Sequence, residues 1–237
     1  MRTPGAVPVL HADAHLIAVD KPAGRLVIPG RTPGEPSLRE ELEAALGRLW
    51  VVHRLDRGTS GVLVLARTAE AHRALNLAFD RGEPEKTYLA LVRGTPAAEF
   101  RVDVAIVAGR KGRMRVGHPG EHGAKAAATG FRTLERFPAQ EGRPDLALVE
   151  CRPETGRTHQ IRVHLAEANA PLAVDPDYGD PGPLELPGGV TLGRTPLHAA
   201  RLALRHPASG EPLVLESPLA QDLRAALEAL RQAKHLT

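Results

Sequence analysis

The segment spanning residues 53–61, HRLDRGTSG, places one carboxylate between two guanidinium groups. Asp56 lies between Arg54 and Arg57, and a carboxylate held among cations stays ionised at neutral pH. An ionised aspartate can serve as a nucleophile or a base, whereas a general acid must carry a proton. The structural alternative is an aspartate that organises a turn, with the glycines of the segment making the bends.

A second polar stretch, residues 155–164, reads TGRTHQIRVH. Thr158 and Arg162 are four residues apart and therefore share a face of a helix, and His159 is a near neighbour of Arg162 on the same helix. These cations lie near the predicted start of the helix, where the helix dipole disfavours positive charge. We therefore expect an anion beside them.

The histidines of this second stretch do not indicate a metal site. His159 and His164 are five residues apart, whereas two metal ligands on one helical face need a spacing of four. The chain has a single cysteine, Cys151, which excludes an internal disulfide and any cysteine-rich zinc module. We expect no metal.

Positive charge is concentrated in residues 101–136. The whole chain carries 31 Lys and Arg against 28 Asp and Glu, a net charge of +3, whereas this stretch holds eight cations against three acids. A flexible basic segment within it, residues 109–115, can lie along phosphate groups. Its cations are Arg110, Lys111, Arg113 and Arg115. The alternative is the solvated tip of a hairpin.

Apolar patterns predict the elements that hold these segments. Buried strands are expected at 49–52 and 62–66, on either side of the Asp56 segment, and a helix at 68–79. A capping box of Ser37 and Glu40 begins an earlier helix whose apolar face reaches Leu49.

Further helices are expected after Gly156 and after Ser217-Pro218. The remaining predicted strands are 7–10, 16–19, 87–92, 101–107, 125–135, 146–152, 197–206 and 212–216. Because few strands alternate with helices, the fold class is α+β, with a mixed, largely antiparallel sheet and flanking helices.

Length and composition set the remaining limits. With 237 residues, 42% of them hydrophobic, the chain can bury a core as one domain over residues 1–237, and no change of composition marks a second domain. No stretch approaches the roughly 18 to 20 apolar residues that cross a membrane. The N-terminus does not read as a signal peptide. We expect a cytoplasmic protein without membrane association.

Three motifs resemble those of the RluA-type RNA pseudouridine synthases. Residues 53–61 resemble the HRLDxxTSG signature of this family, residues 86–92 resemble its K-x-Y-x-A-x-V strand, and residues 156–164 are similar to its GRTHQ[IL]RVH segment. Further matches occur in the same order at 10–24, 177–179, 197–199 and 206–211. The resemblance covers nearly the whole chain.

The resemblance implies the pseudouridine synthase catalytic fold, with a central cleft, and assigns roles to three side chains. Asp56 falls on the catalytic aspartate, Tyr88 on the tyrosine that stacks against the target base, and Arg162 on the arginine that pairs with the catalytic carboxylate. The side chains expected to contact RNA phosphates are Arg54, Arg57 and Arg157 near the mouth of the cleft, and Arg110, Lys111, Arg113 and Arg115 in the basic segment.

This sequence departs from the family pattern in two ways. Gly58 stands where an acidic residue is usual, which puts loop rigidity or a local ion pair in question. Many relatives carry an N-terminal S4-like RNA-binding domain, and we expect none here because the matches begin at about residue 7.

The implied reaction isomerises specific uridines to pseudouridine in structured RNA, either ribosomal or transfer RNA. The target base leaves its stack, detaches from C1′ of the ribose at N1 and rejoins it at C5. Asp56 can attack C1′ or C6 as a nucleophile or remove a proton from C2′ as a base, and the sequence leaves these routes open. Since no redox change or group transfer occurs, we expect no cofactor. We also expect a monomer without an obligate protein partner.

Two other functions remain open at this point. One is a non-catalytic RNA-binding protein on the same scaffold, against which the intact Asp56, Tyr88 and Arg162 argue. The other is an unrelated hydrolase that uses Asp56 with His53 or His159. That chemistry usually needs a second acid or a metal, and the sequence shows no such constellation.

Overall fold

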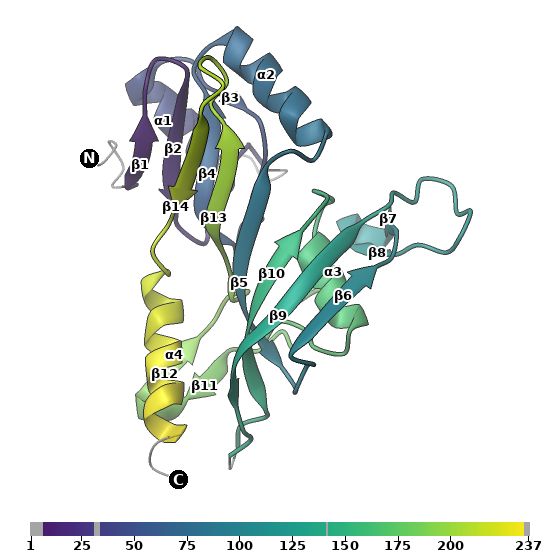
Figure 1. Ribbon diagram of the computed structural model, residues 1–237. Helices are drawn as coiled ribbons and strands as arrows, with labels where there is room; N and C mark the ends of the chain where they lie inside the picture. Colours follow the sequence, from purple (N-terminus) through teal and green to yellow (C-terminus); the bar gives the residue numbers. More distant parts are fainter. Residues whose placement is uncertain (1–6, 31–33, 141, 235–237) are drawn as a thin grey trace. The chain divides into compact units, whose positions relative to one another are not determined.

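The computed structural model describes residues 7–30, 34–140 and 142–234, and it divides the chain into two compact units (Figure 1). Within the described residues, the first unit comprises 7–86 and 199–218, and the second comprises 87–198 and 219–234. Each unit has its own hydrophobic core. The single domain over residues 1–237 stays a prediction.

The first unit is a sheet with two helices. Its strands are β1 (Val9–Ala12), β2 (Leu16–Lys21), β3 (Trp50–Val51), β4 (Ser60–Ala66), most of β13 (Leu197–Arg205) and β14 (Pro212–Glu216), and its helices are α1 (Leu38–Leu46) and α2 (Ala69–Asp80). The strand order is β1-β2-β4-β13, with β3 pairing with β4 and β14 pairing with β13. The pairs β1–β2, β2–β4, β3–β4 and β13–β14 are antiparallel. Residues 52–59 connect β3 to β4, so strands flank the Asp56 segment as predicted. Strand β4 is buried, whereas both residues of β3 are only partly buried.

The second unit is a four-stranded antiparallel sheet in the order β5-β10-β9-β6, with a helix on each face. These strands are β5 (Glu85–Arg93), β10 (Leu146–Pro153), β9 (Ala128–Phe137) and β6 (Glu99–Asp103), and the helices are α3 (Gln160–Glu167) and α4 (Gln221–Lys234). Side chains along a strand alternate between faces. Leu91 of β5 therefore packs with Leu227 of α4, whereas Val92 packs with Ile161 of α3.

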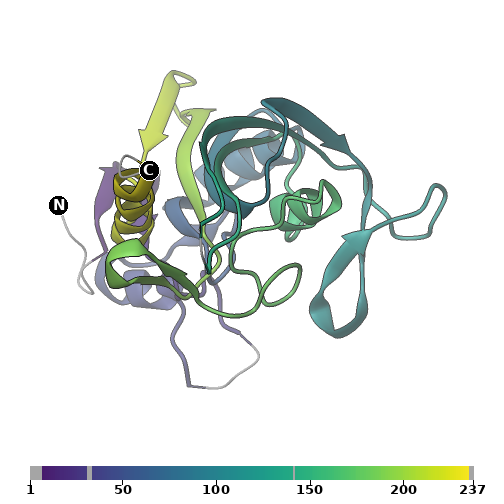
Figure 2. The ribbon, with the colours of Figure 1, turned by 90° about the horizontal axis from the view of Figure 1, so that it is seen from below.

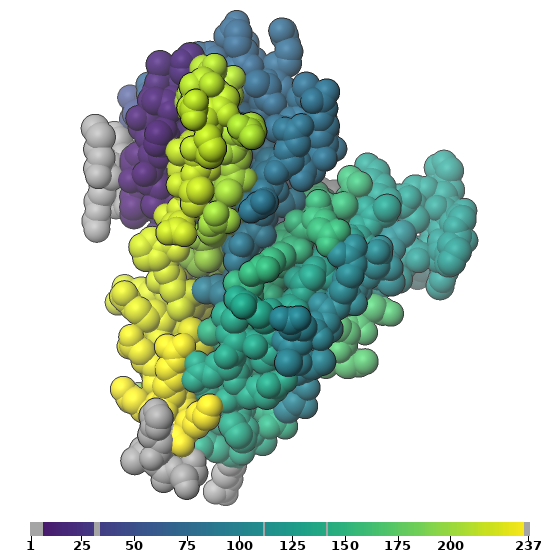
Figure 3. All heavy atoms as spheres, in the orientation of Figure 1, coloured from purple at the N-terminus to yellow at the C-terminus, as the bar shows by residue number. Residues whose placement is uncertain are grey.

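Two small hairpins complete the second unit. One joins β7 (Ile106–Ala108) to β8 (Met114–Val116) through a 3-10 turn, Arg110–Gly112. The other joins β11 (Leu184–Leu186) to β12 (Val190–Leu192) through the turn Pro187–Gly189. The β7–β8 hairpin projects from its unit in Figure 2, and the space-filling view of Figure 3 shows its atoms standing out. The basic segment therefore lies at a projecting hairpin.

The α+β class and the largely antiparallel sheet are confirmed. The capping box is also present, since Ser37 Oγ accepts from the amide of Glu40, and a carboxylate oxygen of Glu40 accepts from the amide of Ser37 at 2.9 Å. None of the helices in the described ranges is both long and apolar enough to cross a membrane.

Several predicted boundaries are wrong for local reasons. Gly47, with φ of 79°, ends α1 before Leu49. Ser217 does not cap α4, because its hydroxyl donates to Asp20 at 2.8 Å and the helix begins at Gln221. The predicted strand 101–107 is divided between β6 and β7.

Helix α3 begins at Gln160, later than predicted, because residues 155–159 form a turn. The side-chain oxygen of Gln160 accepts from Thr155 Oγ1 at 2.7 Å and from the amide of Arg157 at 2.9 Å. His159 adopts the left-handed conformation, with φ of 54°. Thr158 therefore precedes the helix and does not share a helical face with Arg162.

Candidate active site

A buried lysine holds the loop that carries Asp56. Lys21, at the end of β2, is 0% exposed, and its Nζ donates to the carbonyl oxygen of Thr59 at 2.7 Å. The same ammonium donates to the carbonyl oxygens of Asp56 and Arg57, each at 3.3 Å, and to that of Pro22 at 3.1 Å. A buried charge requires such partners. Lys21 thus fixes the main chain at Asp56 and at the residues that follow it, a role that the sequence motifs did not reveal.

Gly61 allows a close approach between two strands of the first unit. Its φ of 112° lies where L side chains are rarely found, and a Cβ at this position would lie 2.2 Å from the carbonyl oxygen of Ala199. No larger residue fits without moving β4 away from β13. The glycine therefore serves packing as well as the bend that the sequence suggested.

His53 is a structural residue of the first unit. The amide of Val64 donates to its Nε2 at 3.0 Å, and its ring stacks on that of Phe79 with centroids 4.9 Å apart. Burial, assisted by the positive charge of Lys86, lowers the pKa of His53 to about 4. The imidazole is therefore neutral, and its acceptor nitrogen is already occupied by a backbone amide. This arrangement does not suit the base of a hydrolase.

Three arginines of the two signature segments were predicted to contact RNA, and all three are exposed: Arg54, Arg57 and Arg157. Arg57 donates through Nε to the carbonyl oxygen of Gly24 at 3.1 Å and through Nη2 to Glu35 at 2.9 Å. Arg157 donates through Nε to the carbonyl oxygen of Ala126 at 3.0 Å. Exposed pairs of this kind contribute little stability. A phosphate can therefore compete for these guanidinium groups.

Tyr88 lies on β5, half-buried, on the face of the second unit's sheet that α3 covers. It is opposite Cys151 of β10 and packs against the cluster that contains Ile161. Cys151 itself is fully buried, which raises the pKa of its thiol and makes it an unreactive core residue. Tyr88 and the helix that carries Arg162 thus share one hydrophobic cluster.

Two carboxylates hold the side chain of Arg162, which is 6% exposed. Its Nε donates to Asp175 Oδ2 at 2.8 Å, and its Nη2 donates to Asp175 Oδ1 at 2.7 Å and to Asp177 Oδ2 at 2.8 Å. The expected anion beside the start of α3 is therefore present. The sequence motifs included Asp177 and missed Asp175, although the acidic run Asp-Pro-Asp in a loop was a visible signal. The pairing of Arg162 with Asp56 stays a prediction.

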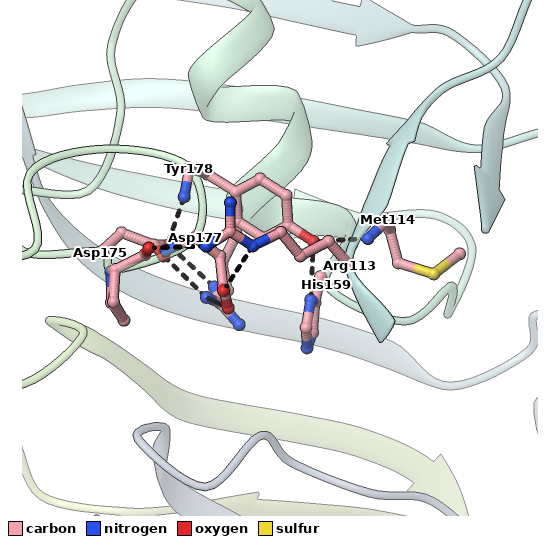
Figure 4. Close-up of polar contacts among 8 residues, drawn as sticks. Arg113, Met114, His159, Asp175, Asp177 and Tyr178 are labelled. Atoms are coloured by element: carbon pink, nitrogen blue, oxygen red, sulfur yellow. Dashed lines mark hydrogen bonds and ion pairs between the residues drawn. The ribbon is translucent and has the colours of Figure 1, made fainter. Parts of the chain in front are cut away.

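Tyr178 extends this group of polar contacts (Figure 4). Its ring lies against the guanidinium of Arg162, with the carbon of that group 4.9 Å from the ring centroid. Its hydroxyl accepts from the amide of Met114 at 2.7 Å and is hydrogen-bonded to His159 Nδ1 at 2.7 Å. Burial raises the pKa of Tyr178.

His164 is engaged on both ring nitrogens inside the second unit. Nε2 donates to the carbonyl oxygen of Val104 at 3.2 Å, and Nδ1 is hydrogen-bonded to Thr129 Oγ1 at 2.9 Å. Because a carbonyl can only accept, Nε2 carries the proton and Nδ1 accepts from the hydroxyl. His164 is therefore a buried structural histidine.

The basic segment makes ion pairs within the second unit. Arg113 donates to Asp177 Oδ1 at 3.0 Å, and Arg115 pairs with Glu121, whose pKa it lowers to about 2. Arg110 is exposed, and the side chain of Lys111 lies outside the described part of the structure. Two of the four cations thus already contact carboxylates.

Comparison with known proteins decides the family. Residues 15–167 match the RNA pseudouridylate synthase family, a span that contains the HRLDRGTSG segment, Tyr88 and all of α3. The chain belongs to this family. As an RNA pseudouridine synthase it is an isomerase that converts uridine to pseudouridine in RNA. The family predicted from the motifs is confirmed, and the non-catalytic alternative is not favoured.

Individual RNA pseudouridine synthases are similar over most of this chain. It is 38% identical over 239 residues to ribosomal large subunit pseudouridine synthase D of Xanthomonas campestris, and 41% identical over 240 residues to the protein of that name from Nitrosomonas europaea. These matches cover 94% and 97% of this chain and 69% and 67% of the relatives. The structure of human RNA pseudouridylate synthase domain containing 4 is similar with a TM-score of 0.72 and 28% identity, over 94% of this chain and 93% of that one.

Proposed function

We propose that this synthase modifies uridines in ribosomal RNA and that Asp56, Tyr88 and Arg162 carry out the reaction. The observation that carries the proposal is the Asp56 loop, whose main chain the buried ammonium of Lys21 fixes at Asp56, Arg57 and Thr59. A protein that only binds RNA does not need an ionisable aspartate held in this way. Such pre-organisation suits a group that must meet a reacting atom.

The proposed chemistry conserves every atom of the nucleotide. The bond from C1′ to N1 breaks, a bond from C1′ to C5 forms, the proton on C5 leaves, and N1 gains a proton. Asp56 acts either as a nucleophile, at C1′ or C6, or as a base at C2′. Tyr88 holds the face of the uracil while the base turns, and Arg162 orients Asp56 and keeps it ionised.

The exposed cations would hold the RNA. Arg54, Arg57 and Arg157 are exposed, as is Arg110 of the basic segment. Phosphate contacts from such residues position an RNA without reading its sequence. The proposed phosphate-binding set is Arg54, Arg57, Arg110, Lys111, Arg113, Arg115 and Arg157.

The names of the relatives favour ribosomal RNA of the large subunit over transfer RNA as the substrate. Within this proposal the protein works in the cytoplasm as a monomer, without a metal, a cofactor or an obligate protein partner. Its RNA would be a folded loop or junction, because sequence-specific recognition of RNA targets bases that can leave their stack.

The test compares pseudouridine maps of large-subunit ribosomal and transfer RNA from cells with and without this protein. We expect specific ribosomal positions to lose the modification and to regain it when the wild-type chain is restored. Restoration with Asp56→Asn should leave those positions as uridine. Loss confined to transfer RNA would overturn the substrate, and full restoration by Asp56→Asn would remove Asp56 from the mechanism.

A further inference from the structure

Asp177, which the proposed chemistry does not use, connects Arg162 to the β7–β8 hairpin (Figure 4). Its Oδ2 accepts from Arg162 Nη2 at 2.8 Å, and its Oδ1 accepts from Arg113 Nε at 3.0 Å. One carboxylate thus lies between a guanidinium of α3 and a guanidinium at the turn of the hairpin. Both cations lower the pKa of Asp177, Arg162 more than Arg113, although burial opposes them.

Tyr178 provides a second link between the same two elements. Its ring contacts the guanidinium of Arg162, while its hydroxyl accepts from the amide of Met114, the first residue of β8. Met114 and Tyr178 also pack against Val163, which directly follows Arg162 in α3. The hairpin therefore contacts the neighbourhood of Arg162 through a charge, a hydrogen bond and apolar packing.

Asp175 anchors the inner end of this connection. Its side chain is 1% exposed, and besides binding Arg162 its Oδ1 accepts from the amides of Asp177 at 3.0 Å and Tyr178 at 3.3 Å. The outer end is accessible, because the side chains of Asp177 and Arg113 are 30% and 54% exposed. An RNA phosphate can therefore reach Arg113 while the contacts of Asp175 with Arg162 stay buried.

We propose that Asp177 and Tyr178 are positioning residues that couple RNA binding at the β7–β8 hairpin to the placement of Arg162. This inference rests on the proposed function, in which Arg162 orients Asp56. A phosphate bound by Arg113 competes with Asp177 Oδ1 for that guanidinium. Asp177 then interacts with Arg162 alone, and the contacts of Arg162 change when RNA engages the hairpin.

The experiment separates the rate of reaction from RNA affinity in the full-length chain. The substrate is a large-subunit ribosomal RNA transcript labelled with tritium at uridine C5, with single-turnover rates measured at saturating enzyme. We expect Asp177→Asn and Tyr178→Phe each to lower that rate by about tenfold while RNA affinity stays within about threefold. Asp180→Asn is the matched control, since Asp180 lies in the same loop but pairs with Arg93, and its rate should match the wild type.

A double-mutant cycle and a structural measurement complete the test. If Arg113 acts on Arg162 through Asp177, Arg113→Gln should change the rate in the wild-type background and have no further effect on the rate in Asp177→Asn. Independently of activity, trypsin should cleave the hairpin several-fold faster in Asp177→Asn and Tyr178→Phe than in Asp180→Asn.

The outcomes distinguish this inference from the proposed function. Rates of Asp177→Asn and Tyr178→Phe equal to that of Asp180→Asn, or independent effects of Arg113→Gln and Asp177→Asn, would overturn the coupling. Unchanged cleavage of the hairpin would overturn the link itself. A wild-type chain that binds but does not convert ribosomal RNA would overturn the proposed function, and the cleavage measurement would still report on the link.

Discussion

Arg162 and Asp175 form a bidentate ion pair in the interior of the second unit, with Nε and Nη2 of the arginine 2.8 and 2.7 Å from the two carboxylate oxygens. The side chains are 6% and 1% exposed. Removing one member of such a pair leaves an uncompensated charge in a region that excludes water. The pair is therefore the contact near Arg162 that is most costly to break.

We expect Asp175→Ala to lower the free energy of unfolding by about 3–5 kcal/mol, because it removes two charge-assisted hydrogen bonds from a buried guanidinium. Urea denaturation measures the change. Asp180→Asn, on a carboxylate that is 45% exposed, is the control and should change stability by less than about 1 kcal/mol. The double variant Asp175→Leu with Arg162→Met should recover part of the loss. A small effect of Asp175→Ala would show that Asp177 alone neutralises the arginine.

We expect Asp56→Asn to abolish isomerisation while RNA affinity stays within a few-fold of wild type. Asparagine keeps the shape of the side chain and loses the charge on which either mechanism depends. Tritium released from RNA labelled at uridine C5 measures turnover, because C5 loses its hydrogen when it joins C1′. Substantial turnover by the variant would contradict the assignment.

We expect Tyr88→Phe to bind RNA normally and to lose most of its single-turnover rate. Phenylalanine keeps the stacking surface, so the loss would report a proton or hydrogen-bonding role of the hydroxyl in addition to stacking. Single-turnover kinetics at saturating enzyme make the measurement. A wild-type rate would confine Tyr88 to stacking.

We expect the combined variant Arg110→Ala and Arg115→Ala to weaken RNA binding and to flatten its dependence on salt. Each lost phosphate contact should reduce the log–log slope by roughly 0.7 for single-stranded RNA. Arg113 is left intact because it contacts Asp177. Affinities measured across a series of KCl concentrations test this, and an unchanged slope would mean that these two cations belong to a solvated hairpin tip.

We expect His53 to contribute a loss of stability as the pH falls from about 6.5 to about 4. Its pKa is about 4 in the folded chain and 6.5 in the reference state, so the unfolded chain takes up a proton first and the folded state is progressively disfavoured over this range. The contribution should reach up to about 3 kcal/mol. His53→Gln keeps an acceptor for the amide of Val64 and should show a shallower fall. Parallel pH profiles would refute the assignment.

The sequence predicted correctly those elements whose formation depends on side chains within a few residues of one another. The strands around Asp56 and the capping box at Ser37 are of this kind, because each depends on a run of neighbouring side chains. The family was predicted from the resemblance, because motifs that match its loop, its strand and its helix start occur here in the same order as in the family.

The contacts that shape the site join positions far apart in the sequence. Lys21 reaches Thr59 across 38 positions, and Arg113 reaches Asp177 across 64. The segment around Lys21 belongs to the motif match at 10–24, but nothing in it indicates that the ammonium binds the Asp56 loop. The start of α3 was misplaced for a related reason, since the turn before it depends on which groups the side chain of Gln160 binds.

Lys21 binds the Asp56 loop through main-chain oxygen atoms, which every amino acid supplies. The loop therefore keeps its course whichever side chains it carries at neighbouring positions. This explains how the chain accommodates Gly58, where the family signature usually has an acid. Substitutions at the side chains of this loop can therefore leave the main chain at Asp56 in place, because the contacts of Lys21 do not depend on those side chains.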